Sequence, residues 1–187
     1  MDELDAAREC VMAVGVRRTT FSDVARRAGV SRMTLYRRYP DLASVLSALI
    51  ARDLGAIILD TQAAVQDLPS ARQRLVEALA RGASAMTRSP LVLRILEVDP
   101  ELLLPYVFDR LGETQRAVLG DLEAHIAEGQ RDGSIRNGNP AAIAACLELS
   151  ARGFVFAARA RERACDPAEA FEQLRAMVDA YLTPVQQ

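Results

Sequence analysis

The sequence predicts an all-α protein with an N-terminal head of three helices and a C-terminal helical bundle. Apolar residues recur at helical spacing along most of the 187 residues, which is typical of amphipathic helices packed on a core. No stretch keeps the alternation of a strand for long. The length suits one large domain or two small ones, and we expect the head to occupy residues 1–45 and the bundle residues 46–187.

Local capping signals define the first two helices of the head. A first helix is expected from Asp2 to Val14. Thr20 can cap a second helix, because Asp23 follows three residues later in the spacing of a capping box. Gly29 comes directly after the last apolar residue of this helix, where a left-handed conformation ends many helices. The apolar residues expected to face inward are Phe21, Val24, Ala25 and Ala28.

The third helix begins directly after the glycine turn. Ser31 is its expected N-cap, and Pro40 ends it. Because the turn is short, the second and third helices must cross, and one face of the third helix points outward. That face holds Arg32, Met33, Thr34, Tyr36 and Arg37. This arrangement indicates a helix-turn-helix, whose second helix enters the major groove of DNA.

The charge distribution indicates a nucleic-acid partner for this segment. Residues 17–39 contain seven arginines and one acid, whereas the rest of the chain has 16 arginines and 24 acids. Such a basic patch attracts phosphate even on an acidic protein. The alternative is a solvated helix face with incidental arginines, which the coinciding caps and glycine turn disfavour. The arginines expected to neutralise phosphates are Arg17, Arg18, Arg26, Arg37 and Arg38.

Residues 20–39 follow the pattern T-x-x-D-[IV]-A-x-x-A-G-V-S-x-x-T-L-Y-x-x-[FY]. This pattern resembles the DNA-binding domain of TetR-type transcriptional repressors, and the resemblance covers about the first fifty residues. It implies phosphate contacts for Thr20, Thr34 and Tyr36. It implies base contacts for Arg32, Met33 and Arg37, and Arg32 is the best candidate to read guanine. Two further residues are expected to contact DNA, namely Ser31, the N-cap of the third helix, and Arg38, the last arginine of that helix. The full expected DNA-binding set is Thr20, Ser31, Arg32, Met33, Thr34, Tyr36, Arg37 and Arg38.

Two positions depart from the family pattern. Met33 stands where glycine is frequent, and its apolar side chain could contact a thymine methyl group. Leu42 stands where lysine is frequent, which removes an expected phosphate contact. These departures leave a second interpretation open, in which the chain is an all-helical dimeric module that binds a ligand or a protein and has lost DNA binding.

The rest of the chain is predicted to form helices separated by proline and glycine. Breaks are expected near Pro69, Pro90, Pro100 and Pro105, and the clearest loop is Asp132–Pro140. The expected helices span residues 42–66, 71–87, 91–98, 106–131, 141–160 and 167–182.

The last two of these helices suggest a dimer interface. Residues 141–160 are rich in small residues, and residues 167–182 keep apolar residues at i, i+3, i+4 and i+7. Both helices could instead cover the core of a single chain. The resemblance favours a dimer, since TetR-type proteins pair their last two helices, and two half-sites about 34–36 Å apart need a two-fold dimer. The expected interface residues are Leu147, Phe154, Phe171, Leu174, Met177, Val178 and Tyr181.

The resemblance also implies a small-molecule effector bound among the C-terminal helices. The pocket should be mostly apolar with a few polar groups, although apolar helical stripes usually form ordinary core. The expected lining residues are Met86, Leu93, Leu96, Leu103, Phe108, Leu122 and Phe154, with Arg110, Gln115 and His125 as polar candidates. The implied protein is a repressor that the effector releases from its DNA operator.

Other classes of function find little support. The chain has one histidine, no H-E-x-x-H, no glycine-rich phosphate loop with Lys-Ser or Lys-Thr, and three cysteines without metal-ligand spacing. We therefore expect no enzyme activity, no cofactor and no metal. The acidic N-terminus lacks the pattern of a signal peptide, and no apolar run approaches the roughly 20 residues of a membrane span. A cytoplasmic protein is expected.

Overall fold

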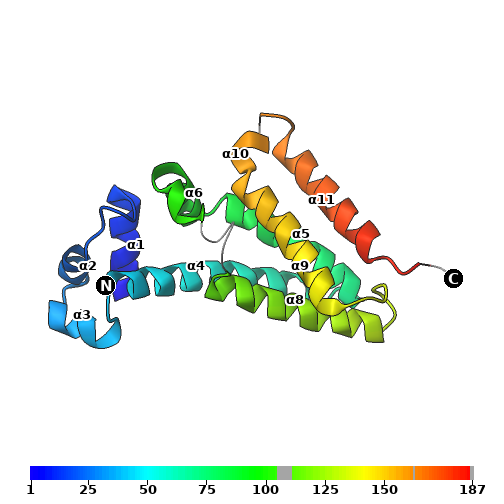
Figure 1. Ribbon diagram of the computed structural model, residues 1–187, viewed down its shortest axis with the longest axis horizontal. Helices are drawn as coiled ribbons and strands as arrows, with labels where there is room; N and C mark the ends of the chain where they lie inside the picture. The colour runs from blue at the N-terminus through cyan, green and yellow to red at the C-terminus, as the bar shows by residue number, and fades with distance from the viewer. Residues whose placement is uncertain (105–110, 162, 186–187) are drawn as a thin grey trace. The chain divides into compact units, whose positions relative to one another are not determined.

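The structure, a computed structural model, describes residues 1–104, 111–161 and 163–185, which form helices and turns without a strand (Figure 1). The all-α prediction is confirmed. The chain divides into two compact units. Unit 1 comprises Met1–Ala56 and Arg88–Leu111, and unit 2 comprises Ile57–Thr87 and Gly112–Gln187.

Unit 1 contains the predicted helix-turn-helix, formed as the capping signals indicate. Its elements are α1 (Glu3–Val14), α2 (Phe21–Ala28), α3 (Arg32–Arg38), the first part of α4 (Leu42–Val65), α6 (Pro90–Val98) and the 3-10 turn η1 (Pro100–Leu102). The Thr20 hydroxyl accepts a hydrogen bond from the Asp23 amide at 3.1 Å. Gly29 has φ 72° and ψ 26°, a left-handed conformation that a side chain would disfavour. The Ser31 hydroxyl accepts from the Thr34 amide at 3.0 Å.

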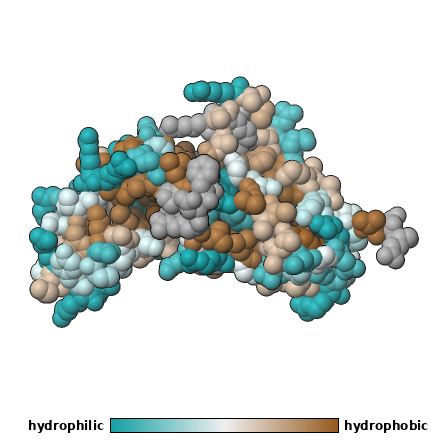
Figure 2. Space-filling model, viewed as in Figure 1, coloured by the Kyte–Doolittle hydropathy of each residue, from teal (hydrophilic) through white to brown (hydrophobic). Residues whose placement is uncertain are grey.

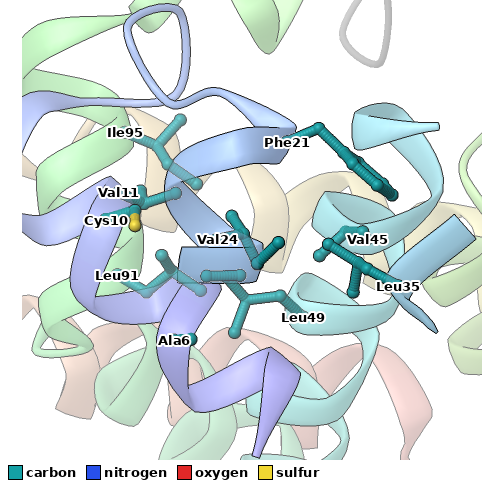
Figure 3. Close-up of a cluster of buried hydrophobic side chains, with 12 residues drawn as sticks. Ala6, Cys10, Val11, Phe21, Val24, Leu35, Val45, Leu49, Leu91 and Ile95 are labelled. Atoms are coloured by element: carbon teal, nitrogen blue, oxygen red, sulfur yellow. The ribbon is translucent and has the colours of Figure 1, made fainter. Parts of the chain in front are cut away.

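One hydrophobic cluster holds unit 1 together (Figure 3). Leu35 of α3 is fully buried, and it lies in this cluster with Val24 of α2 and Leu49 of α4. Leu91 and Ile95 of α6 belong to the same cluster. The sequence-based division did not place α6 with the head, because more than fifty residues separate α6 from α3 along the chain.

Helix α4 has nearly the predicted length, but it is more apolar than expected. Its 24 residues include an 18-residue window of mean hydropathy 1.9, so by length and composition alone it could cross a membrane. The prediction that no apolar run approaches the length of a membrane span did not recognise this helix as a candidate, because Arg52 and Asp53 interrupt its apolar residues. Both side chains form ion pairs with α1, and Val45 and Leu49 are fully buried in the core of unit 1. These contacts are typical of a helix packed within a folded protein.

Unit 2 is a helical bundle in which α5 occupies the central position. Helix α5 (Ala71–Thr87) packs against α8 (Glu113–Arg131), α9 (Pro140–Phe156) and α11 (Pro167–Leu182). The predicted helix over residues 141–160 is interrupted at Ala157, beyond which a short α10 (Ala158–Arg161) follows. The predicted helix over residues 106–131 is seen from Glu113 onward, and its first residues fall outside the described part of the chain.

The loop between α8 and α9 is docked on the end of α11. The Arg136 amide donates to the Leu182 carbonyl at 2.9 Å. The Arg136 side chain donates to the Tyr181 carbonyl at 2.7 Å, and its guanidinium lies 4.3 Å from the centre of the Tyr181 ring. At the end of α8, a Cβ on Gly129 would lie 2.4 Å from Ile135 Cδ1. The loop therefore needs glycine at this position to fold back on the helix.

Candidate nucleic-acid interface

Helix α3 presents its predicted face to solvent. Arg32, Tyr36 and Arg37 are exposed, and Met33 is 70% exposed. Thr34 is half-buried, and its hydroxyl lies 2.9 Å from that of Ser31. Figure 2 shows hydrophilic residues along the outer edge of α2 and α3. The two exposed arginines and Met33 can therefore reach an external ligand without rearrangement of the helix.

The ring of Tyr36 connects this face to the preceding helix. Tyr36 stacks on Phe21 at the start of α2, with ring centroids 4.3 Å apart and an interplanar angle of 29°. Phe21 is buried, whereas Tyr36 is 44% exposed. An aromatic pair of this kind adds about 0.5–1.5 kcal/mol beyond the burial of its area. The stacking fixes the orientation of the Tyr36 ring, and the exposed part of the side chain can contact a ligand.

Four of the seven arginines in residues 17–39 already have partners within the protein. Arg17 lies 2.9 Å from Glu101, Arg26 2.6 Å from Asp23, and Arg27 3.3 Å from Glu9. Arg38 is the fourth, and Glu3 is its partner. Among the described residues, no carboxylate lies within 4.0 Å of Arg18, Arg32 or Arg37. The structure thus separates three available cations from four that are neutralised, which the sequence count did not do.

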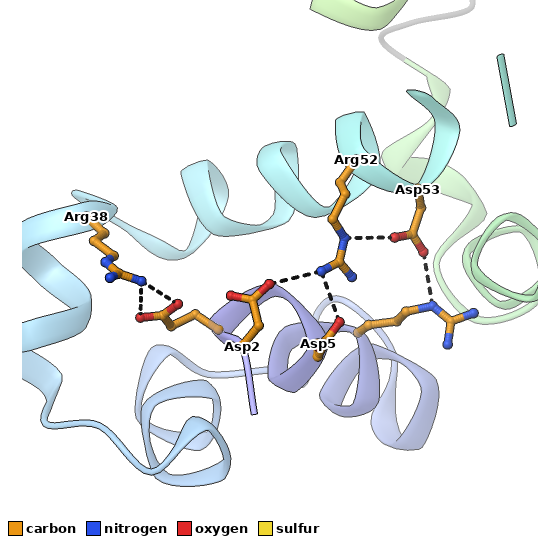
Figure 4. A network of polar contacts seen from close by, with 7 residues as sticks. Asp2, Asp5, Arg38, Arg52 and Asp53 are labelled. Atoms are coloured by element: carbon orange, nitrogen blue, oxygen red, sulfur yellow. Dashed lines mark hydrogen bonds and ion pairs between the residues drawn. The ribbon is translucent and has the colours of Figure 1, made fainter. Parts of the chain in front are cut away.

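The pair between Arg38 and Glu3 differs from an ordinary surface ion pair. Arg38 Nη1 donates to both carboxylate oxygens of Glu3, at 2.7 and 2.8 Å (Figure 4). Glu3 is buried, so removal of Arg38 would leave a desolvated carboxylate without its counter-charge. Arg38 therefore has a structural task between α3 and the start of α1, whereas exposed surface pairs contribute only about 0–1 kcal/mol.

This difference predicts unequal effects of two neighbouring substitutions on DNA binding. We expect Arg37→Ala to lower the slope of log K against log salt by about one per bound subunit, because each neutralised phosphate contributes about 0.9 to that slope. Arg38→Ala should leave the slope close to that of the parent protein and should lower thermal stability instead. Fluorescence anisotropy at several salt concentrations measures both. An equal fall in slope for Arg38→Ala would show that Arg38 binds phosphate despite Glu3.

The side chain of Leu42, the departure at the start of α4, is accounted for by packing. Leu42 is half-buried and packs against the hydrophobic cluster of unit 1. A lysine ammonium group at this position would have to reach past that cluster to solvent. The leucine thus extends the core of the head, and the unpartnered cations of this surface come from the turn before α2 and from α3.

The predicted dimer residues lie on two sides of the last helices. Leu147, Leu174 and Val178 are buried in unit 2, whereas Met177 and Tyr181 are exposed. Phe154 and Phe171 are half-buried and contact one another, with ring centroids 6.1 Å apart.

The predicted effector residues are divided between the two units. Met86, Leu122 and Phe154 belong to unit 2, and Leu93, Leu96 and Leu103 to unit 1. Leu122 is buried and Leu93 is exposed, whereas Phe108 lies outside the described residues. The polar candidate Arg110 lies outside them as well. The ring of His125 is held within α8, where Nδ1 lies 2.8 Å from the Asp121 carbonyl.

A shallow pocket lies elsewhere, within unit 1. It measures about 180 Å³ and opens between α1 and α2, beside Cys10, Thr19 and the arginines Arg18, Arg26 and Arg27. Burial raises the pKa of the Cys10 thiol, so the reactive thiolate is disfavoured at neutral pH. In the described part of the chain, no group of three or more His, Cys, Asp or Glu side chains is arranged to hold a metal ion.

The fold and this surface define a DNA-binding protein of the helix-turn-helix class with a helical second domain. Residues 4–49 match the model of the "Bacterial regulatory proteins, tetR family". An HTH-type transcriptional regulator of Mycobacterium bovis, Mb2274c, is 31% identical over 179 residues, covering 96% of this chain and 92% of that protein. AqdR of Rhodococcus erythropolis is 40% identical over 67 residues, 35% of this chain and 32% of AqdR. The chain therefore belongs to the tetR family of bacterial transcriptional regulators.

Solved structures share the same fold. FadR of Bacillus subtilis, in complex with stearoyl-CoA, has a TM-score of 0.71 at 17% identity, covering 96% of this chain and 97% of that one. AibR, in complex with isovaleryl coenzyme A and operator DNA, has a TM-score of 0.57 at 18% identity, covering 98% and 97%. The family consists of regulators, and neither the fold nor the relatives suggest catalysis.

Proposed function

We propose that this protein is a ligand-responsive repressor that binds a pseudo-palindromic operator as a homodimer. The observation that carries the proposal is the exposed face of α3, on which Arg32 and Arg37 have no partner among the described residues. Residues 1–45 serve as the DNA-binding domain, and residues 46–187 carry ligand binding and dimerisation. As a regulator of transcription, the protein acts in the cytoplasm.

In this proposal α3 reads the major groove. Arg32 lies at the start of the helix, where a guanidinium can donate to guanine O6 and N7, and Met33 contacts a thymine methyl group. The amides at the starts of α2 and α3, capped by Thr20 and Ser31, face phosphates. Further contacts to the DNA backbone come from Thr34, Tyr36, Arg18 and Arg37. Such contacts position the protein without reading the base sequence. The exposure of Arg18, Arg32, Met33, Tyr36 and Arg37 supports the assignment.

We expect Arg32→Ala to weaken operator binding by about 1–3 kcal/mol and to relax the preference for guanine at one position of each half-site. The parent protein and the variant are compared by selection of binding sites from random duplexes. Arg27→Ala is the matched control, because Arg27 is also an exposed arginine of the head but is paired with Glu9. An unchanged consensus for Arg32→Ala would remove Arg32 from the base-reading residues.

Tyr36→Phe should lower affinity for all duplexes without altering the preferred sequence. The substitution keeps the ring that stacks on Phe21 and removes only the hydroxyl, whose hydrogen bond to phosphate is worth about 0.5–1.5 kcal/mol. The same selection and an anisotropy titration test the prediction. A shifted consensus would contradict a phosphate contact for this side chain.

The dimer is proposed to form through α9 and α11. The exposed stripe of α9 carries no charge, although charged residues make up 26% of the sequence. Its members recur at helical spacing and are Ala142, Cys146, Leu149 and Gly153. Met177 and Tyr181 are exposed apolar residues of α11. Small uncharged residues beside exposed apolar ones suit the close packing of two helix pairs, and the buried members of the predicted set would support this face from within.

The effector is proposed to be a small, mostly apolar molecule bound among the helices after residue 45. The structural neighbours bind stearoyl-CoA, isovaleryl coenzyme A and choline, and a relative from Bacillus subtilis, 20% identical over 138 residues, is a "Fatty acid metabolism regulator protein". Acyl-CoA thioesters of several chain lengths are therefore the first ligands to test, with the acyl chain as the apolar part that the helices would bind and the charged coenzyme A moiety outside it. A coupling of about 1–3 kcal/mol between effector and operator is enough for regulation.

Selection of binding sites from genomic DNA with the purified full-length protein tests the proposal. We expect an enriched inverted repeat with half-site centres about 10 base pairs apart or a multiple of that, and release of this duplex by one class of acyl thioester. Failure to enrich any duplex at low ionic strength would overturn DNA binding. Enrichment of an asymmetric single site would overturn the two-fold dimer.

A further inference from the structure

Residues at the end of α6 and in η1 contact the turn that leads into α2. Arg94 of α6 donates to the Ala13 carbonyl at 3.3 Å. The Val16 amide donates to Asp99 Oδ2 at 2.6 Å. Glu101 of η1 pairs with Arg17 at 2.9 Å. All these residues belong to unit 1, and the contacts join segments more than eighty residues apart in sequence.

Asp99 is the central member of this group. It is only 3% exposed, and its position is fixed by the backbone where α6 ends and η1 begins, since its amide donates to the Ile95 carbonyl at 3.0 Å. A buried carboxylate needs partners that compensate its lost hydration. The Val16 amide is such a partner, and a hydrogen bond to an ionised acceptor is roughly twice as strong as a neutral one.

The conformation of the turn is adapted to this carboxylate. Gly15 has φ +86°, and a Cβ at this position would lie 2.7 Å from Asp99 Oδ2 and 2.7 Å from Val98 Cγ1. Glycine is therefore needed here for two reasons. It adopts a positive φ without strain, and it leaves room for the close approach of Asp99. The Gly15 carbonyl in turn accepts from the buried Thr19 hydroxyl at 2.7 Å.

The chain leads from this turn directly into the DNA-binding motif. Thr19 precedes Thr20, the N-cap of α2, and α2 carries Phe21, on which Tyr36 of α3 stacks. A continuous series of contacts thus runs from Asp99 through Gly15 and Thr19 to the start of the helix-turn-helix. Loss of the first contact would leave the Val16 amide without its acceptor and the turn free to adopt other conformations.

From these contacts we propose that Asp99 is a positioning residue for DNA binding, which sets the start of α2 by holding the Val16 amide. The inference rests on the proposed DNA binding of this head. Asp99 touches no DNA in this scheme. It acts through the turn, so its loss should reduce the preference for the operator over unrelated duplexes, because only the specific complex requires the exact orientation of α3.

The test compares Asp99→Ala and Asp99→Asn with Glu123→Gln, a charge change at an exposed acid of α8 in unit 2. Asp99→Ala should bind the selected operator about tenfold more weakly, with non-specific binding at low salt retained. Asp99→Asn keeps an acceptor and should show a smaller loss, and Glu123→Gln none. Ile126→Val, which lowers stability at a buried position of α8 in unit 2, should keep the ratio of specific to non-specific affinity.

Hydrogen exchange provides a readout that does not depend on DNA. The Val16 amide should exchange faster in Asp99→Ala and at an intermediate rate in Asp99→Asn. If the alanine variant does not fold, the asparagine variant decides by the same two measurements. The positioning role would be overturned if the Val16 amide of these variants exchanged at the rate of the parent protein. It would also be overturned if their ratio of specific to non-specific affinity equalled that of the parent protein. Absence of duplex binding by the parent protein would instead refute the proposed function, with the Val16 result standing separately.

Discussion

Leu149→Glu is expected to convert the protein into a monomer of 20.4 kDa and to weaken binding to a two-half-site operator by about 10²–10⁴-fold. Leu149 is 56% exposed on the uncharged stripe of α9. In the proposed dimer it packs against the partner, and a glutamate there would bury a carboxylate without a counter-charge at a cost of several kcal/mol. The DNA effect follows because a dimer binds its second half-site intramolecularly, which gives this gain in avidity without new contacts.

The matched control for this variant is Leu59→Glu. Leu59 lies on α4 and is 67% exposed, so the chemical change is the same at a leucine outside the proposed interface. Sedimentation velocity gives the mass of each variant, and anisotropy with a full operator and a single half-site gives the avidity. A Leu149→Glu variant that remains dimeric, or a Leu59→Glu variant that dissociates, would place the interface elsewhere.

The parts of the head that sequence predicts well are those determined by neighbours along the chain. The caps at Thr20 and Ser31 and the left-handed Gly29 all depend on residues three or four positions away. The confirmed helix-turn-helix therefore follows from short-range signals, which a single sequence contains in full.

The pairing of the arginines could not be predicted in the same way. Arg38 and Glu3 are 35 residues apart, and Arg17 and Glu101 are more than eighty residues apart. A count of charges identifies the basic segment, but only the folded arrangement shows which cations are neutralised. The acids at the N-terminus were a signal for such pairing, although nothing in their spacing identified Arg38 as the partner.

The last helices show a second limit of periodicity. Helix α11 has a buried stripe that includes Leu174 and Val178, and it also has Met177 and Tyr181 on its exposed side. Helical spacing identifies apolar positions but does not distinguish a face that covers its own core from one that meets a partner. The structure separates the two faces, and the interface remains a prediction that Leu149→Glu tests.

Leu35→Ala should lower the free energy of unfolding by about 2–5 kcal/mol, the range for deletion of a buried leucine side chain. Leu35 is fully buried with Val24, Val45 and Leu49 (Figure 3). It is the only residue of α3 that is buried, so it makes the main apolar contact between α3 and the core, beside the stacking of Tyr36 on Phe21 and the pair of Arg38 with Glu3. Urea unfolding followed by circular dichroism measures the loss as a shift of the midpoint.

Two controls separate the loss of this anchor from a general effect of substitution. Leu35→Met conserves most of the volume and should cost less than about 1.5 kcal/mol, whereas Leu59→Ala at an exposed site should stay within about 0.5 kcal/mol of the parent. Hydrogen exchange locates the effect, because amides of residues 32–38 should lose protection before those of unit 2. If Leu35→Ala unfolds at the parental midpoint, α3 is held by contacts other than its buried leucine, and the stacking of Tyr36 on Phe21 becomes the principal attachment of the recognition helix.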